Sequence, residues 1–547
     1  MSGQLAVVPI FMSAGAAVLP TVLAALASVG AILLDPRKLI RAVRSHPGRS
    51  ALVLAFLLMG GWAGWWMFGS SGHAARGAMQ AERRVDWAKV GQAIVDRQAA
   101  GQALTSFDAG ITSPATAASQ GSHPPGTEIP ASHVAPVTSD FARTNADGSA
   151  HPQNLKPLWK FNPDQTMFLS RPAIFGQTIY VAGNQSDLGA YDGMLAALDA
   201  QTGKAVWQVT DLPAEWQKKL HQDVLPAFFS SPALTPDGKY LVIGQGFHED
   251  KNCALLCFDT ATHAVKWAVQ TPLHIESSPA IFGDMAVVGA GAIEGKDGRA
   301  MGDPGFVLAV RISDGKELWR QAVNDPESSP VVDGDGMVFI GSGCNGNAVV
   351  AMRSAPDEEL RQKGLTRIAW RTPVPYPALG DVTLAGDLVV VGIGNGTLVK
   401  SDTDPHGGVY AFDKKSGEMK WHRELGDLVL GSVAFRDGVL VCGCRTGEVV
   451  AMNSKDGGIL WRNNISGRAP VLAGPAFTGK RVYAVSGDGY LAVLDARDGK
   501  MIGAKVGLND PKDPGSGVSS SPPQVVGERV IVGSETGGVR CLAGTSE

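Results

Sequence analysis

Cysteine and histidine most often carry redox, haem or metal chemistry, and this chain of 547 residues contains 6 cysteines and 11 histidines. No two cysteines are adjacent, and no Cys-x-x-Cys-His motif for haem attachment occurs. Cys442 and Cys444 alternate along one predicted strand, which puts them about 6.6 Å apart with parallel Cβ directions, a poor disulfide geometry. Cys257 and Cys541 stand where other copies of a repeat carry alanine, so we expect small buried side chains there.

Two short segments bring carboxylate and imidazole groups close together in the sequence. They are Asp402, Asp404 and His406 in one segment, and His248, Glu249 and Asp250 in the other. Loops that bind hard cations need several oxygen ligands at fixed spacing, with a glycine in the turn. Neither segment has that spacing, so we interpret both as solvated surface. The sequence predicts no metal ion, no cofactor and no catalytic residue.

Aromatic side chains within insertions indicate binding instead. The longest departures from the repeat described below are residues 184–193, 211–229, 245–252, 290–305 and 393–408. The order of the predicted strands places all of them on one face, and function on a rigid scaffold tends to lie on such loops. The candidate partner-binding residues are Trp216, Phe228, Phe229, His248, Asp402 and His406. The alternative is that these are tolerated surface insertions without a binding role.

A repeated β framework must position these loops. Each unit opens with small residues and proline, as in Ser277-Ser278-Pro279, and continues with an apolar strand that ends in glycine. A second apolar strand follows and often ends in aspartate, and then a tight turn contains glycine, which supplies the positive φ. The last strand carries a tryptophan that we expect to dock on the neighbouring unit. These tryptophans are Trp207, Trp267, Trp319, Trp370, Trp421 and Trp461.

The two ends of the repeat complete each other. The eighth unit ends after three strands, whereas a single strand around Trp159 (155–161) precedes the first unit. Pairing this strand with the last unit would remove the open edges of an incomplete sheet. Each unit of four short strands has the size of a propeller blade. The sequence therefore predicts an all-β, eight-bladed propeller over residues 155–547.

The small-residue, apolar, Asp…Gly…Trp pattern resembles the tryptophan-docking repeat of the pyrroloquinoline-quinone-like (PQQ-like) eight-bladed propeller family. The resemblance covers roughly residues 155–547. It implies one of two kinds of protein. Some members are dehydrogenases that bind the quinone and Ca²⁺ on the propeller axis and stack the quinone on a disulfide between adjacent cysteines. Others are cofactor-free scaffolds, such as the propeller lipoprotein of the outer-membrane protein assembly machinery.

Residues 1–70 predict a membrane anchor. Two uncharged apolar runs, about 5–34 and 50–68, are long enough for transmembrane helices, and a loop rich in Arg and Lys separates them. The positive-inside rule puts that loop in the cytoplasm and the propeller on the other side. A cleaved signal peptide is the alternative for the first run. The sequence of residues 71–104 predicts a helical stalk. Residues 105–150 are rich in Ser, Thr and Pro, a composition that predicts a disordered linker.

The net charge of the chain argues against one class of function. A formal net charge of −4 argues against a nucleic-acid binder that works through massed Lys and Arg. We expect a non-enzymatic scaffold in the inner membrane of a bacterium, with its propeller in the periplasm or outside the cell, that binds a protein or an envelope polymer. One alternative is a quinoprotein dehydrogenase with PQQ and Ca²⁺. The other is a sensor that signals through a partner protein.

Overall fold

The computed structural model describes residues 151–545, apart from 188–189, 223, 248–249, 293–303, 344–345 and 396–400. The expected anchor with its two transmembrane helices, the stalk and the linker lie outside these residues. Among the described residues, no helix has the length and apolar character that a membrane span requires.

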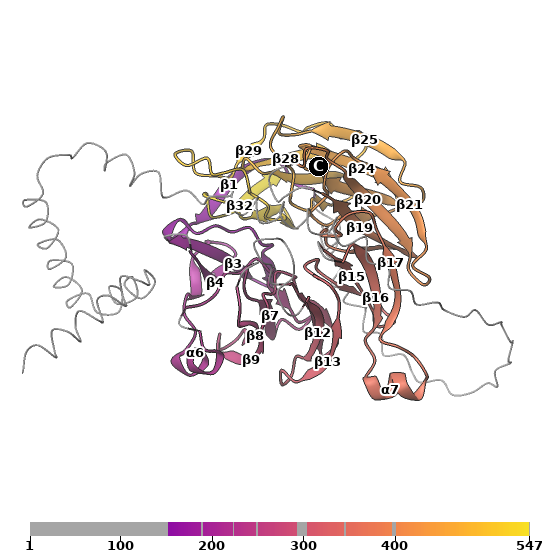
Figure 1. Ribbon diagram of the computed structural model, residues 1–547. Helices are drawn as coiled ribbons and strands as arrows, with labels where there is room; N and C mark the ends of the chain where they lie inside the picture. Colours follow the sequence, from indigo (N-terminus) through magenta and orange to yellow (C-terminus); the bar gives the residue numbers. More distant parts are fainter. Residues whose placement is uncertain are drawn as a thin grey trace, which may run out of the picture. The chain divides into compact units, whose positions relative to one another are not determined.

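The described residues form eight four-stranded antiparallel sheets, which is the eight-bladed propeller that the repeat predicts (Figure 1). Blade 1 contains β2 (Ala173–Phe175), β3 (Thr178–Asp187), β4 (Ala190–Asp199) and β5 (Ala205–Val209). Blade 2 contains β6 (Ala233–Leu234), β7 (Tyr240–Gly244), β8 (Cys253–Asp259) and β9 (Val265–Thr271). Blade 3 contains β10 (Ala280–Phe282), β11 (Met285–Ala290), β12 (Phe306–Arg311) and β13 (Glu317–Ala322). Blade 4 contains β14 (Val331–Val332), β15 (Met337–Ser342), β16 (Ala348–Arg353) and β17 (Ile368–Pro373).

The other four blades repeat this order of strands. Blade 5 contains β18 (Thr383–Ala385), β19 (Leu388–Gly394), β20 (Gly407–Asp413) and β21 (Met419–Glu424). Blade 6 contains β22 (Ala434–Arg436), β23 (Val439–Gly443), β24 (Glu448–Asn453) and β25 (Ile459–Asn464). Blade 7 contains β26 (Ala476–Phe477), β27 (Arg481–Ser486), β28 (Tyr490–Asp495) and β29 (Val506–Gly507). Blade 8 contains β30 (Gln524–Val526), β31 (Arg529–Val532), β32 (Val539–Thr545) and β1 (Gln153–Phe161).

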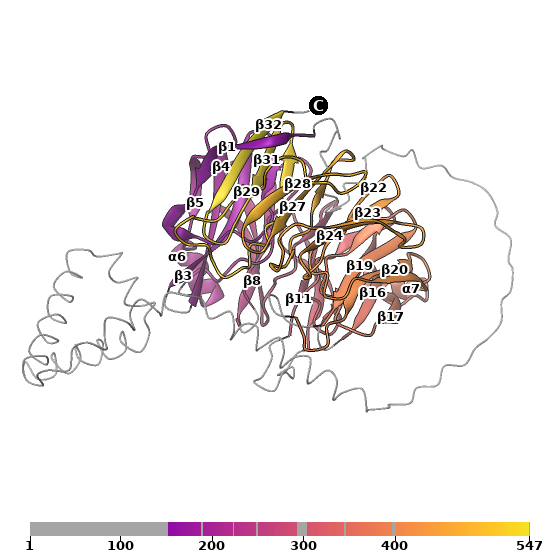
Figure 2. The ribbon, with the colours of Figure 1, turned by 90° about the horizontal axis from the view of Figure 1, so that it is seen from above.

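Strand β1 closes the ring, as the orphan tryptophan strand predicts. It pairs antiparallel with β32 from the other end of the chain, and Trp159 stands opposite Cys541. Figures 1 and 2 both show the indigo β1 beside the yellow β32. The pairing satisfies an edge of β32 that would otherwise expose its backbone N–H and C=O groups.

The central strands of each blade are buried on both faces because a neighbouring blade covers each face. In β20, Tyr410 and Phe412 pack against blade 4, whereas Val409 and Ala411 pack against blade 6. This explains the nearly continuous apolar runs, such as Val-Tyr-Ala-Phe, at the centre of each unit. The outer strand β21 has one face toward solvent and alternates between exposed and partly buried residues.

The Ser-Ser-Pro segments connect the inner strands of blades 2, 3 and 4. The first serine stays within its blade: Ser277 Oγ accepts the N–H of Gly289 at 3.1 Å. The second serine bridges blades, because Ser278 Oγ accepts the N–H of Ser231 at 2.9 Å while the N–H of Ser278 donates to Ser329 Oγ at 3.0 Å. The repeated serines therefore satisfy backbone groups that no sheet hydrogen bond reaches.

The tryptophans dock on the following blade through a shared hydrogen bond. In each case the indole Nε1–H donates to a backbone carbonyl just after the third strand of that blade. The pairs are Trp159 with Ala200, Trp267 with Ile312, Trp319 with Ser354, Trp370 with Lys414, Trp421 with Ser454 and Trp461 with Ala496. Trp207 instead stacks on His263 of blade 2, at 4.9 Å between ring centroids, where other blades have glycine in the turn.

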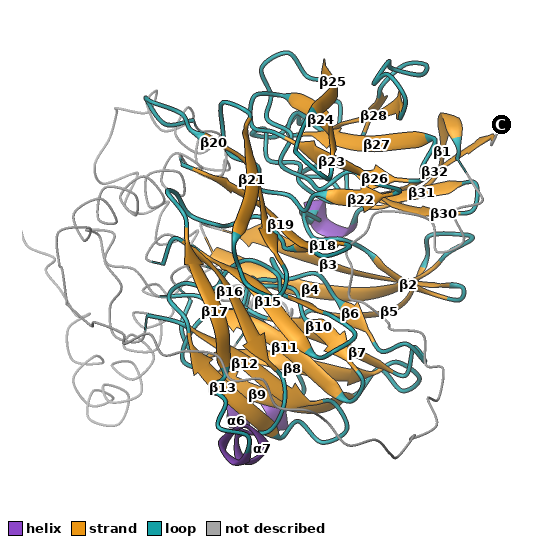
Figure 3. Cartoon of the chain, turned by 90° about the vertical axis from the view of Figure 1, so that its right-hand side faces the viewer, coloured by secondary structure: helices purple, strands orange, loops and turns teal. Residues whose placement is uncertain are grey.

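Helices occur within the connections between strands (Figure 3). Helix α6 (Ala214–Leu220) lies between blades 1 and 2, and α7 (Asp357–Gln362) lies in the β16–β17 hairpin. A 3₁₀ turn, η1 (Pro163–Gln165), follows β1. The insertion 184–193 is not a separate loop: it lengthens β3 and β4, which pair from Asn184↔Gly193 to Asp187↔Ala190.

Candidate functional site

The connection between blades 1 and 2 is the largest described elaboration on the face that bears the insertions. Leu212, Leu220 and Leu225 in this connection are buried and join the core cluster between the two blades. They fix α6 against the propeller, and Trp216 on this helix is partly buried against the same cluster. Lys219 Nζ lies 4.4 Å from the centroid of the Trp216 ring. The face therefore presents an aromatic ring beside a cation on a firmly packed helix.

The two phenylalanines at the end of this connection differ in exposure. Phe228 is only 1% exposed, and its backbone is held by Asn184, whose Oδ1 accepts the Phe228 N–H at 2.6 Å. We therefore assign Phe228 to the core rather than to a docking surface, because its side chain packs between blades. Phe229 is partly buried and stacks on Phe247 at 4.3 Å between ring centroids.

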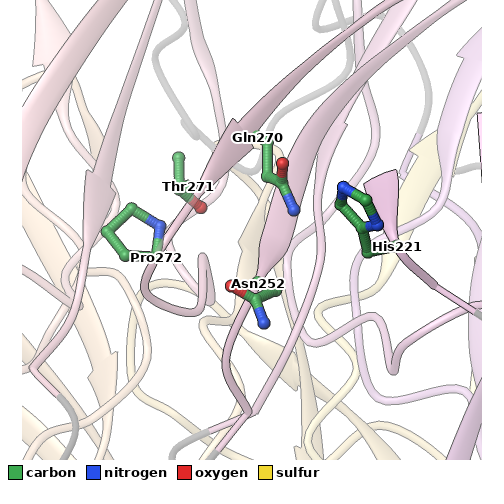
Figure 4. A pocket seen from close by; sticks show the side chains of 5 residues that line it. All are labelled: His221, Asn252, Gln270, Thr271 and Pro272. Atoms are coloured by element: carbon green, nitrogen blue, oxygen red, sulfur yellow. The ribbon is translucent and has the colours of Figure 1, made fainter. Parts of the chain in front are cut away.

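An open pocket of about 420 Å³ lies beside α6. His221, Asn252, Gln270, Thr271 and Pro272 line it (Figure 4). The pocket joins two insertions, since His221 caps α6 in the left-handed conformation and Asn252 ends the 245–252 loop. Gln270 Nε2 donates to the Leu220 carbonyl at 2.9 Å, which fastens the helix to β9. His221, Asn252, Gln270 and Thr271 give the lining hydrogen-bonding groups, and Pro272 adds an apolar wall, a composition that suits binding of backbone or amide groups.

The Asp402 and His406 segment folds as a hydrogen-bonded turn. Asp402 Oδ1 accepts the N–H of Asp404 at 3.1 Å, and His406 Nε2 lies 3.3 Å from Asp404 Oδ2. The His406 ring stacks on the Tyr376 ring at 5.4 Å between centroids, and the backbone N–H of His406 donates to Asn395 Oδ1 at 2.7 Å. Asp402 and His406 are partly exposed at blade 5, whereas His248 lies outside the described residues.

A buried ion pair supports this segment. Arg445 Nη1 lies 3.2 Å from Asp427 Oδ1, and both side chains are almost completely buried. The same Arg445 Nη1 donates to the Asn395 carbonyl at 3.0 Å, so the pair also holds the start of the 395–406 connection. Burial lowers the pKa of Arg445, and the charge of Asp427 opposes that shift.

The structure also brings together three residues that sequence reasoning missed: His274, Glu276 and Glu327. His274 Nε2 lies 3.2 Å from Glu327 Oε1 and 3.8 Å from Glu276 Oε1. The two glutamates occupy equivalent positions, each directly before a Ser-Ser-Pro segment of successive blades. The repeated Glu-Ser-Ser-Pro motif is a signal from which the two glutamates could have been found. His274 stands two residues before the first motif, and the next copy has no histidine at the corresponding position.

The cysteines do not fit the quinone site that the dehydrogenase branch implies. Cys442 and Cys444, the closest pair in sequence, are both free and buried. Burial raises the pKa of each thiol, and Cys444 Sγ donates to the Asp427 carbonyl at 3.5 Å. These side chains pack in the core between blades 5 and 6, so neither offers a surface on which a quinone could stack.

The similarity to a known protein family covers the whole propeller. The profile of the family described as "Outer membrane protein assembly factor BamB" (PQQ_2) matches residues 152–404 and 405–546. The chain belongs to this family. BamB of Yersinia pestis is 23% identical over 342 residues, which cover 61% of this chain and 75% of the relative. BamB of Burkholderia pseudomallei is 24% identical over 381 residues, covering 67% and 82%.

Similarities are also found to an enzyme and to solved propeller structures. The quinohemoprotein alcohol dehydrogenase ADH-IIG of Pseudomonas putida is 25% identical over 254 residues, covering 45% of this chain but 31% of that enzyme. Among solved structures, BamB from Moraxella catarrhalis superposes with a TM-score of 0.50 at 16% identity, covering 71% of this chain and 99% of its own. Sqt1 from Chaetomium thermophilum gives 0.53 at 12% identity, covering 72% and 98%. The structural likenesses show the shared propeller fold.

Proposed function

We propose that this protein is a non-catalytic scaffold that binds a protein partner during assembly of the bacterial envelope. The observation that carries the proposal is the family match, which spans the propeller from residue 152 to residue 546. The relatives are named as outer membrane protein assembly factors. The predicted anchor would hold the propeller at the periplasmic side of the inner membrane, with residues 105–150 as a tether. Both placements are part of this proposal.

The insertion-bearing face supplies the binding surface in this proposal. Trp216 and Lys219 on α6, the adjacent pocket, and the stacked Tyr376 and His406 at blade 5 offer aromatic and cationic contacts. Aromatic rings on a rigid support bind with little loss of conformational entropy. A partner with acidic and aromatic side chains, or an extended backbone segment in the pocket, would match this chemistry.

Site-specific photo-crosslinking tests the proposed face. A photoreactive residue at the exposed Lys218 on α6 should capture an envelope-assembly protein in intact cells of the source bacterium. The matched control is Glu358, which is 60% exposed on α7, on the opposite face by strand direction. Equal capture at both positions would remove the support for a face-specific partner.

A second experiment addresses the activity itself. Loss of the gene should lower the amount of folded protein in the outer membrane, because a scaffold that assists assembly would be missing. The purified full chain, supplied with PQQ and Ca²⁺, should show no dye reduction with alcohols or sugars. Clear turnover in that assay would overturn the scaffold proposal in favour of the quinoprotein alternative.

A further inference from the structure

Three metal-ligating side chains converge at the start of blades 3 and 4. His274 and Glu276 lie in the connection from β9 to β10, and Glu327 lies in the next connection, from β13 to β14. One ligand atom of each side chain lies within 4.8 Å of the other two. The cluster is enclosed, since the side chains of His274, Glu276 and Glu327 are 0%, 17% and 9% exposed.

Two of the separations are close to those between ligands of one small cation. Zinc bonds of about 2.0–2.2 Å in a tetrahedral arrangement place two ligand atoms about 3.4 Å apart. The distances of 3.2 Å and 3.8 Å from His274 Nε2 to the two carboxylates bracket that value. An imidazole with two carboxylates suits Zn²⁺ and its transition-metal neighbours, whereas Mg²⁺ and Ca²⁺ prefer oxygen ligands throughout.

Gly291 leaves room at the centre of the cluster. A Cβ atom on this residue would lie 2.5 Å from His274 Nε2 and 3.1 Å from Glu327 Oε1. A side chain here would therefore occupy the space next to both ligand atoms, which the glycine leaves to a small ligand. The Gly291 N–H donates to the His274 carbonyl at 3.2 Å, which holds this glycine beside the cluster.

The side chains themselves suit a dication. Two carboxylates from the connections that enter successive blades reach one enclosed site, together with the imidazole of His274. A divalent cation would use the carboxylate oxygen atoms and Nε2 as ligands.

We propose that His274 Nε2, Glu276 and Glu327 bind one divalent transition-metal cation of the Zn²⁺ class. The ion links the connections that enter blades 3 and 4, on the face that bears the insertions. Three protein ligands leave a coordination position for water or for a donor atom of a bound partner. This inference does not depend on the proposed scaffold function, because metal binding is measured on the isolated chain.

The test is a titration of the detergent-solubilised full chain with Zn²⁺ alone, after treatment with a chelator and its removal. We expect one saturable site by calorimetry and a rise of the thermal unfolding midpoint with Zn²⁺. Glu276→Gln should weaken Zn²⁺ binding at least tenfold and abolish the rise, since it removes a ligand. This glutamate is the most exposed of the three, so its substitution disturbs folding least.

A matched control is His406→Asn, which removes the histidine of the other His–carboxylate pair, where His406 Nε2 and Asp404 Oδ2 are 3.3 Å apart. This variant should bind Zn²⁺ like the unaltered chain. His274→Gln should abolish binding, and if it fails to fold, Glu276→Gln still decides the result. Equal affinity of Glu276→Gln and the unaltered chain, or no binding at all, overturns the proposal. Equally tight binding of Ca²⁺ overturns the assignment of the metal class.

Discussion

The indole of Trp461 in blade 6 lies against Gly499 in the turn between β28 and β29 of blade 7. A Cβ atom on Gly499 would lie 2.4 Å from Cε3 of the indole, and φ at this glycine is +71°. Trp461 Nε1 also donates to the Ala496 carbonyl of the same turn at 2.8 Å. Glycine is therefore favoured at this position for two reasons: it allows the left-handed turn, and it leaves space for the indole ring of the preceding blade.

Gly499→Ala separates these two reasons when it is compared with Gly386→Ala. Gly386 has φ of +67°, and a Cβ atom added there would have nothing within 4 Å, so its substitution tests the backbone conformation alone. We expect Gly386→Ala to lower the free energy of unfolding by about 1–2 kcal/mol. Gly499→Ala should lose about 1–3 kcal/mol more, because the methyl group overlaps the indole. Equal losses in denaturant unfolding would contradict the docking role.

Removing β1 should destabilise the whole propeller. A chain that begins at residue 162 lacks the strand that pairs with β32 and lacks Trp159, which docks on Ala200 of blade 1. Compared with a chain that begins at residue 151, we expect a lower thermal midpoint and faster proteolysis, because blades 8 and 1 lose their closure. If the two chains melt at the same temperature, β1 does not close the ring.

The buried ion pair predicts a large effect for Asp427→Asn. This substitution leaves Arg445 charged and almost completely buried without its carboxylate, so we expect a loss of about 3–5 kcal/mol in the free energy of unfolding. The comparison is Asp437→Asn, which removes a carboxylate that is 88% exposed and lies 3.5 Å from Arg436 Nε. That change should cost less than about 1 kcal/mol. Similar losses in the free energy of unfolding from both variants would show that the buried pair stabilises the fold no more than the exposed pair.

The buried thiols predict a loss of stability at alkaline pH. Burial raises the pKa of Cys257 to about 12 and that of Cys541 to about 11. In the unfolded chain these thiols ionise at about pH 8.5. Their contribution to the free energy of unfolding is therefore complete below that pH and declines as the pH rises toward about 11–12, because the unfolded state releases protons first. Denaturant titrations at about pH 7 and about pH 10 measure this, with Cys257→Ala as the control that reduces the difference.

Thiol labelling provides an independent check of the same burial. The cysteines that the structure describes are all buried, so they should react with a thiol reagent only as fast as the chain unfolds. Cys344 lies outside the described residues, so the experiment uses a Cys344→Ser background. Rapid labelling of Cys442 or Cys444 in the native protein would show that the blade 5–6 interface opens readily.

The blade architecture could be predicted because the information is local and repeated. The apolar runs, the turn glycines and the tryptophans recur in each unit, and the unmatched strand at each end of the repeat implies the pairing of β1 with β32. Loops carry no such redundancy. In the sequence, nothing distinguishes Phe228 from Phe229 as a candidate binding residue. In the structure, Phe228 is buried in the core, whereas Phe229 stacks on Phe247.

The sequence alone determined the number of blades, the closure of the ring and the face that bears the insertions, because periodic burial on a β framework leaves few other solutions. Which side chains of different blades meet depends on the folded structure. His274 and Glu327 are 53 residues apart, and their contact depends on the angle between successive sheets and on the path of each connection. Those features arise from packing between blades, which no single repeat encodes.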